Sequence, residues 1–149
     1  MAKERPKIPI AVHLFLLDGD KVLLLRRFNT GYEDGNYSVP AGHLDGDEEV
    51  RVATAREALE EANVKIKTED IEMVGVMHRV SDREGVDFFA VAKKWTGKIK
   101  VMEKDKCDDL RWFDMDDLPE NTIPYIRRAI ENYKAGKTFD SMGWEEAKK

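Results

Sequence analysis

Three glutamates lie close together in the middle of the chain, at positions 57, 60 and 61. Residues three and four apart share one face of a helix, so the carboxylates of Glu57, Glu60 and Glu61 fall within an arc of about 100°. Hard divalent cations take oxygen ligands, and Mg²⁺ in particular uses a few carboxylates together with substrate phosphates. The spacing therefore predicts a Mg²⁺ site. A solvated acidic face, partly neutralised by Arg51 and Arg56, is the alternative interpretation of the same residues.

These glutamates belong to the best-defined helix of the sequence, which we expect over residues 45–62. Asp45 and Glu48 resemble a capping box at its start, and Asn63 stands where a left-handed C-cap residue is expected. The helical projection places the small and apolar residues opposite the glutamates, on a face predicted to pack against the body of the protein. That face consists of Val52, Ala55, Ala58, Leu59 and Ala62.

The segment before this helix, Val39 to Leu44, contains Pro40 and Gly42. Proline restricts the direction of the chain, and glycine permits a close approach of the backbone. We expect a tight turn here that aims backbone carbonyl groups at the same metal.

The rest of the chain predicts several strands and a second helix. Apolar runs at 8–17 and 21–25 flank Asp18-Gly19 and predict a hairpin, and 28–36 is a loop. Further strands are expected over 37–39, 71–80, 86–95 and 110–113, with a helix over 124–134. The pattern favours an α/β protein with a mixed sheet between helices.

Length and composition predict one soluble domain. The 149 residues form a single domain with a core over about 8–134, and the polar segment 137–149 either docks or stays loose. A single cysteine, Cys107, excludes an internal disulfide and fits a reducing compartment. The charged start, Met1 to Lys7, shows no signal peptide, and no apolar run is long enough for a membrane span, so we expect a cytoplasmic protein. A net charge of −5 does not favour binding to a nucleic-acid backbone.

The run from Gly42 to Val64 resembles the Nudix box. In that box a glycine, five residues, a glutamate and seven residues lead to Arg-Glu, an aliphatic, any residue, Glu-Glu, any residue, a glycine and an aliphatic. Gly42, Glu48 and the run Arg56 to Glu61 match this pattern, whereas Asn63 replaces the last glycine. The resemblance covers most of 8–134 and implies an α/β/α sandwich of the Nudix type that cleaves a nucleoside diphosphate linked to another moiety.

The resemblance also implies roles for the matched residues. Glu57, Glu60 and Glu61 would hold Mg²⁺, with Mn²⁺ as a substitute. Gly42, through its carbonyl, and Glu48 would assist in metal binding. Arg56 would orient the glutamates by a salt bridge. A water activated by the metals would attack phosphorus, with Glu57 or a carboxylate of a later loop as general base. Three such later carboxylates are Glu103, Asp108 and Asp109.

Candidate substrate-binding residues lie outside the box. Arg26 and Arg27 end the second strand, where guanidinium groups suit phosphate oxygens, and similarity to MutT-like members favours Arg27. His43 could reach a phosphate, and Asn121 stands near the place of a base-reading asparagine in those members. Each of the four also has an ordinary structural explanation.

The substrate class is reached by elimination. No tyrosine occurs between Lys65 and Pro124, unlike in dinucleoside-polyphosphate hydrolases, and no proline between Lys65 and Leu118, unlike in ADP-ribose hydrolases. What remains is a MutT-like hydrolase of (deoxy)nucleoside triphosphates, oxidised purine nucleotides included. Three alternatives stay open: an ADP-ribose or nucleotide-sugar pyrophosphatase, an RNA 5′ pyrophosphohydrolase, and a non-catalytic nucleotide sensor. The expected partner is a small nucleotide, with no membrane and no DNA-binding domain. Homodimers occur in the family, and the sequence leaves the oligomeric state open.

Overall fold

A hairpin opens the fold, as the sequence predicts. Leu17 pairs with Val22 and Asp18 with Lys21, which leaves Gly19 and Asp20 as the turn. Gly19 has φ +59°, a left-handed conformation that glycine adopts without strain. The structure, a computed structural model, describes residues 3–147, so the ends of the charged N-terminal segment and of the polar tail lie outside it.

The described elements are strands with helices between groups of them. In order they are β1 (Ile10–Asp18), β2 (Lys21–Arg27), β3 (Tyr37–Ser38), β4 (Ala41–His43), α1 (Val50–Ala62), η1 (Thr68–Asp70), β5 (Ile71–Val80), β6 (Glu84–Ala92), β7 (Cys107–Asp114), α2 (Pro124–Ala135), β8 (Phe139–Met142) and α3 (Trp144–Ala147).

β1 joins two groups of strands. From Ile10 to Leu16 it runs parallel to β6, and at Ala11–His13 it also pairs antiparallel with β4 on its other side. β5 follows β6 antiparallel, and β8 follows β5 parallel. At its end β1 pairs with β2, which also carries β3 and β7. The combination of parallel and antiparallel pairs confirms the predicted mixed sheet.

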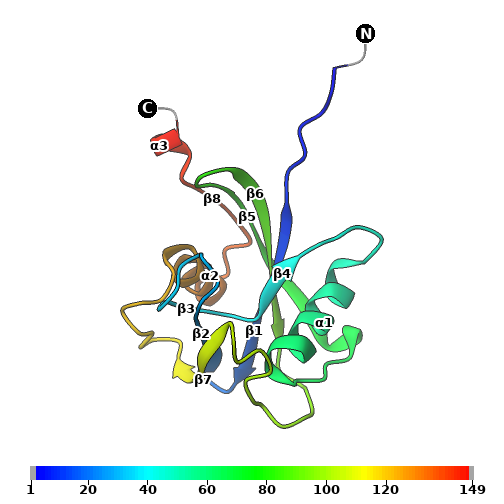
Figure 1. The fold of residues 1–149 in the computed structure, drawn as a ribbon, viewed down its shortest axis with the longest axis vertical. Helices are drawn as coiled ribbons and strands as arrows, with labels where there is room; N and C mark the ends of the chain where they lie inside the picture. The colour runs from blue at the N-terminus through cyan, green and yellow to red at the C-terminus, as the bar shows by residue number, and fades with distance from the viewer. Residues whose placement is uncertain (1–2, 148–149) are drawn as a thin grey trace.

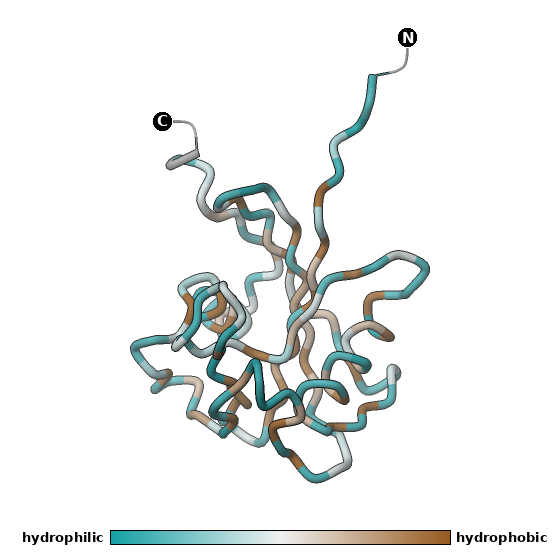
Figure 2. The backbone as a smooth tube through the Cα atoms, viewed as in Figure 1, coloured by the Kyte–Doolittle hydropathy of each residue, from teal (hydrophilic) through white to brown (hydrophobic). Residues whose placement is uncertain are grey.

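The two long helices cover opposite faces of this sheet, as Figure 1 shows with α1 on the right and α2 on the left. Leu14, Leu16 and Leu23 pack with Ala58 and Ala62 of α1. The alternate residues of the strands pack against α2 in a second apolar cluster, which includes Phe15, Leu24, Phe89, Ile126 and Ile130. The apolar stretches of the tube in Figure 2 accordingly lie along the strand interiors. The predicted α/β/α sandwich is confirmed.

Helix α1 begins at Val50, five residues after the predicted start. Gly46 and Asp47 have φ values of +94° and +56°, which no helix accommodates. Glu49 is the N-cap, and its side chain accepts a hydrogen bond from the Arg51 backbone N–H. The predicted capping box of Asp45 and Glu48 is therefore wrong. Asn63 has the expected left-handed conformation, with φ 60° and ψ 29°.

The buried face of α1 also differs from the prediction. Val52 and Leu59 are 46% and 43% exposed, whereas Ala53, Thr54, Ala58 and Ala62 are buried. The helix packs through these small side chains, and its contact face is rotated toward the glutamates because β4 approaches it there. Periodicity could not reveal this rotation, since alanine counts as weakly apolar on any face.

The polar tail docks against the sheet. β8 pairs with β5 from Val76↔Phe139 to Arg79↔Met142, and the Trp144 indole Nε1 donates to the His78 carbonyl at 2.9 Å. Asp140 is buried in this segment, where Arg128 of α2 reaches it. The alternative of a loose tail is therefore excluded for residues 139–144.

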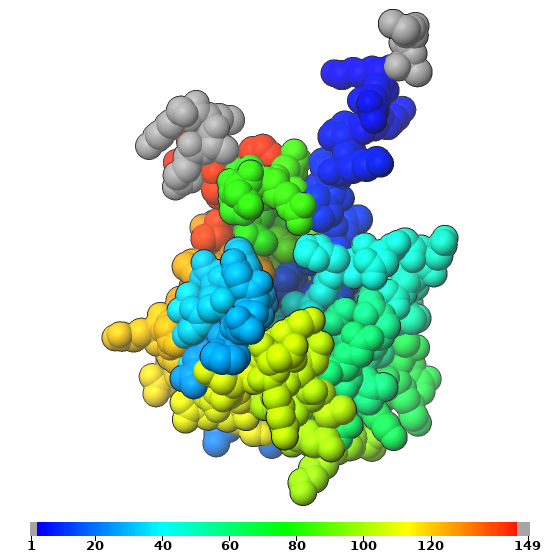
Figure 3. Space-filling view, viewed as in Figure 1, coloured from blue at the N-terminus to red at the C-terminus, as the bar shows by residue number. Residues whose placement is uncertain are grey.

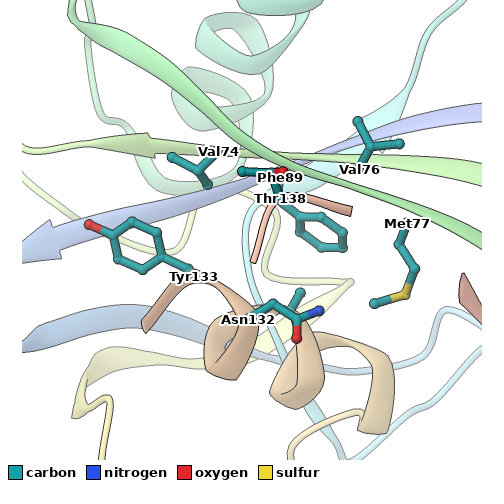
Figure 4. Close-up of a pocket in the computed structure, with 9 residues that line it drawn as sticks. Val74, Val76, Met77, Phe89, Asn132, Tyr133 and Thr138 are labelled. Carbon is teal, nitrogen blue, oxygen red and sulfur yellow. The ribbon is translucent and has the colours of Figure 1, made fainter. Parts of the chain in front are cut away.

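A small crevice lies where β5, β6 and α2 meet. Figure 4 shows Val74, Phe89 and Tyr133 among the side chains around it. Its volume is about 10 Å³, which is at most enough for one water molecule. This crevice belongs to the packing of the core and is too small for a nucleotide. Separately, none of the helices within residues 3–147 combines the length and the apolar character that crossing a bilayer requires.

Candidate active site

The predicted metal-binding residues meet where β4 runs past α1. The Ala41 backbone N–H donates to Glu61 Oε2 at 2.9 Å. At Gly42 a Cβ atom would overlap the Glu57 carboxylate, so glycine lets the carboxylate lie directly against the backbone of β4. The expected tight turn is a short strand instead, since Gly42 pairs with Val12 of β1. Strand pairing thereby fixes the backbone that the glutamates contact.

Arg56 links the glutamates to one another. Its Nε and Nη2 donate to both carboxylate oxygens of Glu48 at 2.8 and 2.9 Å. Its Nη1 donates to Glu57 Oε1 at 2.8 Å and to Glu60 Oε2 at 3.3 Å. A bidentate pair of this kind fixes the guanidinium plane, and the guanidinium in turn holds the Glu57 carboxylate toward β4.

Burial acts on Glu57 and Glu61, the two inner glutamates of α1. It raises the pKa of Glu61 well above its usual range, which the Ala41 N–H opposes and the charges of Glu57 and Glu103 reinforce. The pKa of Glu57 is also raised by burial, against the stabilising effect of Arg56. Two partly buried carboxylates in contact with one backbone segment favour a bound cation, because a cation offsets both desolvation and mutual repulsion.

A divalent cation fits these residues. Within residues 3–147 no group of three acidic, histidine or cysteine side chains is preassembled as a closed cluster. In this site Arg56 and the Ala41 N–H each donate to an oxygen of Glu57 and Glu61, respectively. The donors are all oxygens, which suits Mg²⁺, and the absent side chain at Gly42 leaves the Glu57 carboxylate accessible from β4.

The glutamates form one wall of a cavity of about 870 Å³. Glu57, Glu60 and Glu61 line it together with Arg27, and the far wall is built from β1, β5, β6 and α2. Figure 3 shows the hollow between the loop 29–36 in light blue, β4 in cyan, the turn before β6 in green and the segment 103–107 in yellow-green. The volume falls within the range of small-molecule sites.

The candidate substrate residues separate into two groups. Arg27 and His43 line the cavity. Arg27 also shapes the loop above it, since its Nε donates to the Tyr32 carbonyl at 2.6 Å and its Nη2 to Thr30 Oγ1 at 3.0 Å. Arg26 and Asn121 are outside the lining: Arg26 pairs with Asp108 at 2.7 Å, and Asn121 donates to the Gly35 carbonyl at 2.7 Å. Asn121 thus stabilises the loop 29–36 from a position outside the cavity lining.

Among the three later carboxylates, Glu103 is the one that lines the cavity. Its nearest cationic partner is Lys106 at 3.6 Å. Asp108 is engaged by Arg26, and Asp109 by Arg111 at 3.0 Å. The structure therefore brings Glu103 to the inner glutamates and keeps the two aspartates away from them.

The far wall of the cavity holds residues that the sequence reading missed. His13, Arg79, Asp87 and Tyr125 all line it. His13 and Asp87 are buried although each lies within an apolar strand. A histidine at an inward position between Val12 and Leu14, and an aspartate two residues before Phe89, were the signals available, because strands rarely bury such groups unpaired.

Comparison with known proteins agrees with this fold. The model of the NUDIX domain family matches residues 7–133. The chain therefore belongs to the Nudix family.

Individual relatives support the same assignment. The chain is 30% identical over 128 residues to the NAD-capped RNA hydrolase NudC of Pseudomonas syringae pv. tomato, across 86% of this chain and 43% of that protein. It is 31% identical over 116 residues to NudC of Pseudomonas putida, across 76% and 39%. The chain thus spans less than half the length of these curated relatives. A MutT Nudix hydrolase from Burkholderia pseudomallei superposes with a TM-score of 0.78 at 25% identity, over 85% of this chain and 98% of that one.

Proposed function

We propose that this Nudix hydrolase cleaves nucleoside triphosphates to a nucleoside monophosphate and pyrophosphate with Mg²⁺. The observation that carries the proposal is the single cavity that joins the glutamates of α1 to an aromatic and cationic far wall. Its size suits one nucleotide rather than a polymer. The net charge of −5 also gives no general attraction for an RNA backbone.

Glu57, Glu60 and Glu61 would hold the metal, with the Gly42 carbonyl as a further oxygen ligand. When bound, the metal neutralises phosphate charge and lowers the pKa of a coordinated water. Glu48 lies outside the cavity lining and is bound by Arg56 through both oxygens, so we assign it to positioning Arg56. Arg56 then keeps Glu57 directed at β4.

Other side chains of the cavity act on the substrate directly. Arg27, at the root of the loop 29–36, donates to phosphate oxygens, and His43 adds a donor beside Gly42. Glu103 accepts the proton of the attacking water, since it is the acidic side chain of the 103–109 segment that lines the cavity. Glu57 would bind the metal and accepts a hydrogen bond from Arg56, so it is a less suitable general base than Glu103.

The main alternative substrate is an NAD-capped RNA 5′ end, because the two NudC relatives carry that activity in their names. They are matched over less than half of their length, so residues outside the shared part can determine their substrate. ADP-ribose and nucleotide sugars remain further candidates of the same chemistry.

A substrate panel separates these activities. The purified chain with Mg²⁺ is incubated with canonical and oxidised nucleoside triphosphates, ADP-ribose, a nucleotide sugar, a dinucleoside polyphosphate and NAD-capped RNA. Products are resolved by ³¹P NMR and ion-exchange chromatography. Monophosphate plus pyrophosphate from a triphosphate is the expected result. Selective cleavage of NAD-capped RNA or ADP-ribose would retain the family and overturn the substrate proposal.

The metal assignment has its own variant. Glu61→Gln preserves the size of the side chain and still accepts from the Ala41 N–H, but it removes the charge that a cation needs. We expect a loss of turnover of at least about 100-fold with an unchanged circular dichroism spectrum. Glu69→Gln, on the exposed turn η1, is the matched control and should retain full activity. Full activity of Glu61→Gln would refute the metal assignment.

A further inference from the structure

The far wall of the cavity contains a buried chain of polar contacts across three strands. The His13 Nε2 lies 2.9 Å from Asp87 Oδ1, and the Arg79 Nε donates to Asp87 Oδ2 at 2.9 Å. His13 and Asp87 are both 3% exposed. The three residues come from β1, β6 and β5 and share the face of the sheet that α2 covers. Such a network is costly to bury, so its geometry is firmly fixed once it is satisfied.

His13 takes part as a neutral donor. Burial lowers its pKa, which the contact with Asp87 only partly opposes. The Nε2–H therefore donates to the ionised Asp87, and Nδ1 is left as a buried acceptor with no hydrogen-bond partner among residues 3–147. Stacking on Phe89 at 4.9 Å fixes the ring. His13 thus holds Asp87 in place without adding charge.

All three residues line the cavity, and Arg79 is the most exposed of them. Its guanidinium lies 3.7 Å above the centre of the Tyr125 ring, and its side chain is 20% exposed. Only Nε makes a short hydrogen bond. Nη2 is 3.5 Å from Asp87 Oδ1, and Nη1 has no hydrogen-bond partner within residues 3–147. A planar group with fixed orientation therefore presents N–H donors toward the cavity.

The charge of Arg79 is already compensated by Asp87. A phosphate at this place would meet a nearly neutral pair, whereas an uncharged acceptor still gains a strong hydrogen bond. The position also separates Arg79 from the phosphate end. The backbones of Gly42 on β4 and Arg79 on β5 are three strand spacings apart through β1 and β6, about 14 Å across the sheet, and the Arg79 side chain reaches back over β6 to Asp87. With phosphates at the glutamates, the part of the cavity that Arg79 lines is left for the nucleobase.

We propose that Arg79 is a specificity-determining residue that selects 6-oxopurine nucleotides over 6-aminopurine nucleotides, with Asp87 as its positioning residue. A guanidinium only donates, and guanine and hypoxanthine present two acceptors, O6 and N7, on one edge. Adenine places an amino donor at the 6-position and would face donor against donor. The proposal rests on the proposed function for the location of the phosphates, and it concerns the other end of the same cavity.

Inosine and adenosine nucleotides are the matched probes, because the 6-oxo or 6-amino group is their essential difference. kcat/KM is measured for ITP, GTP and ATP, and the dissociation constants of IMP and AMP are measured by calorimetry. We expect ITP and GTP to exceed ATP by about 10- to 100-fold, and IMP to bind more tightly than AMP by a similar factor. Equal values, a preference for adenine, or no binding of either monophosphate would overturn the proposal.

Variants of Arg79 test whether this residue causes the preference for 6-oxopurines. Arg79→Gln offers one donor and one acceptor in a plane, so the oxo preference should fall to within about 2-fold or invert. Arg79→Lys keeps the charge against Asp87 but lacks the planar pair of donors, so it should lose most of the preference for ITP over ATP. Arg51→Gln, on the exposed first turn of α1, is the control. An unchanged preference in both Arg79 variants would refute the assignment.

The calorimetric readout separates this proposal from the proposed function. If no triphosphate is hydrolysed but IMP still binds more tightly than AMP through Arg79, the triphosphatase proposal fails and the base preference stands. If triphosphates are hydrolysed without discrimination between oxo and amino purines, the triphosphatase proposal stands and the base preference fails.

Discussion

The inner glutamates of α1 are held in an arrangement that is unfavourable for the protein by itself. Glu61 lies beneath β4 and Glu57 against Gly42, and burial raises the pKa of both carboxyl groups. Side chains that served only stability would be neutral at such positions, since a buried uncompensated charge destabilises a fold. The arrangement becomes favourable when a cation is bound, which links metal affinity to the stability of the fold.

This link predicts opposite effects of one substitution on stability and on activity. Glu61→Gln removes a buried carboxylate next to Glu57, so the metal-free variant should unfold at a higher temperature than the unsubstituted protein. We expect the free energy of unfolding to rise by about 1 kcal/mol and the unfolding temperature by roughly 3 °C, measured by differential scanning calorimetry with EDTA. Added Mg²⁺ should stabilise the unsubstituted protein and leave the variant unchanged. A variant that is less stable in EDTA would contradict this account of Glu61.

Gly42 predicts a loss of activity without a loss of stability. In Gly42→Ala the new methyl group would displace the Glu57 carboxylate, whose end is a movable side chain rather than backbone. We expect kcat to fall by at least about 10-fold, because misplacing a group by 1 Å has a large effect on catalysis. The unfolding temperature should change little. Gly75→Ala is the control, since a Cβ there would be 3.7 Å or more from its neighbours.

At the scale of elements, the longer strands and α2 were predictable, whereas β4, β8 and the placement of α1 were not. Apolar segments predict β1, β5 and β6, and Pro124 and Gly136 delimit α2. The start of α1 depends on the left-handed backbone of Gly46 and Asp47, which neighbouring residues do not encode clearly. Its buried face depends on how closely β4 approaches, which is a tertiary contact that periodicity cannot represent.

The C-cap of α1 gives a prediction at this scale. Asn63 has the left-handed conformation that the family fills with glycine, and its Nδ2 donates to the Lys98 carbonyl at 2.8 Å. Asn63→Ala should destabilise the fold by about 1–2 kcal/mol, since alanine loses the hydrogen bond and tolerates the conformation poorly. Asn63→Gly adopts the left-handed conformation without strain and loses only the hydrogen bond, so its free energy of unfolding should stay within about 1 kcal/mol of that of the unsubstituted protein. Chemical denaturation measures both, and equal effects would argue against a conformational role.

The docking of β8 should depend on pH through Asp140. Arg128 donates to both oxygens of Asp140 at 2.6 and 3.0 Å, and this contact holds the pKa of Asp140 below its usual range. The stabilisation is fully present above the pKa of Asp140 in the unfolded chain, about 4. It is lost as the pH falls through the lower pKa of Asp140 in the folded protein. Asp140→Asn should therefore lower stability at pH 7, on the order of 1 kcal/mol, and the difference should shrink toward pH 3. Asp117→Asn, at an exposed position, should show no such trend.

For the whole molecule, the sequence predicted one half of the site and not the other. The phosphate end derives from a contiguous run, Gly42 to Glu61, whose spacing is visible in the chain. The far wall is assembled from β1, β5, β6 and α2, so His13, Arg79, Asp87 and Tyr125 become neighbours only through strand pairing and helix packing. A cavity is a property of the assembled layers, and local sequence carries little of it.

The two halves of the cavity should respond to separate ligands. A non-hydrolysable nucleoside triphosphate with Mg²⁺, at about 100 times its dissociation constant, should stabilise the fold by about 2.7 kcal/mol, or roughly 8 °C. In Glu61→Gln the part of this shift that depends on Mg²⁺ should disappear, whereas the shift caused by the nucleotide in EDTA should remain, because the far wall is intact. Thermal-shift titrations of both proteins measure the two contributions. If the unsubstituted protein were stabilised by nucleotide equally with and without Mg²⁺, and turned over no substrate, the molecule would be a nucleotide sensor rather than a metal-dependent hydrolase.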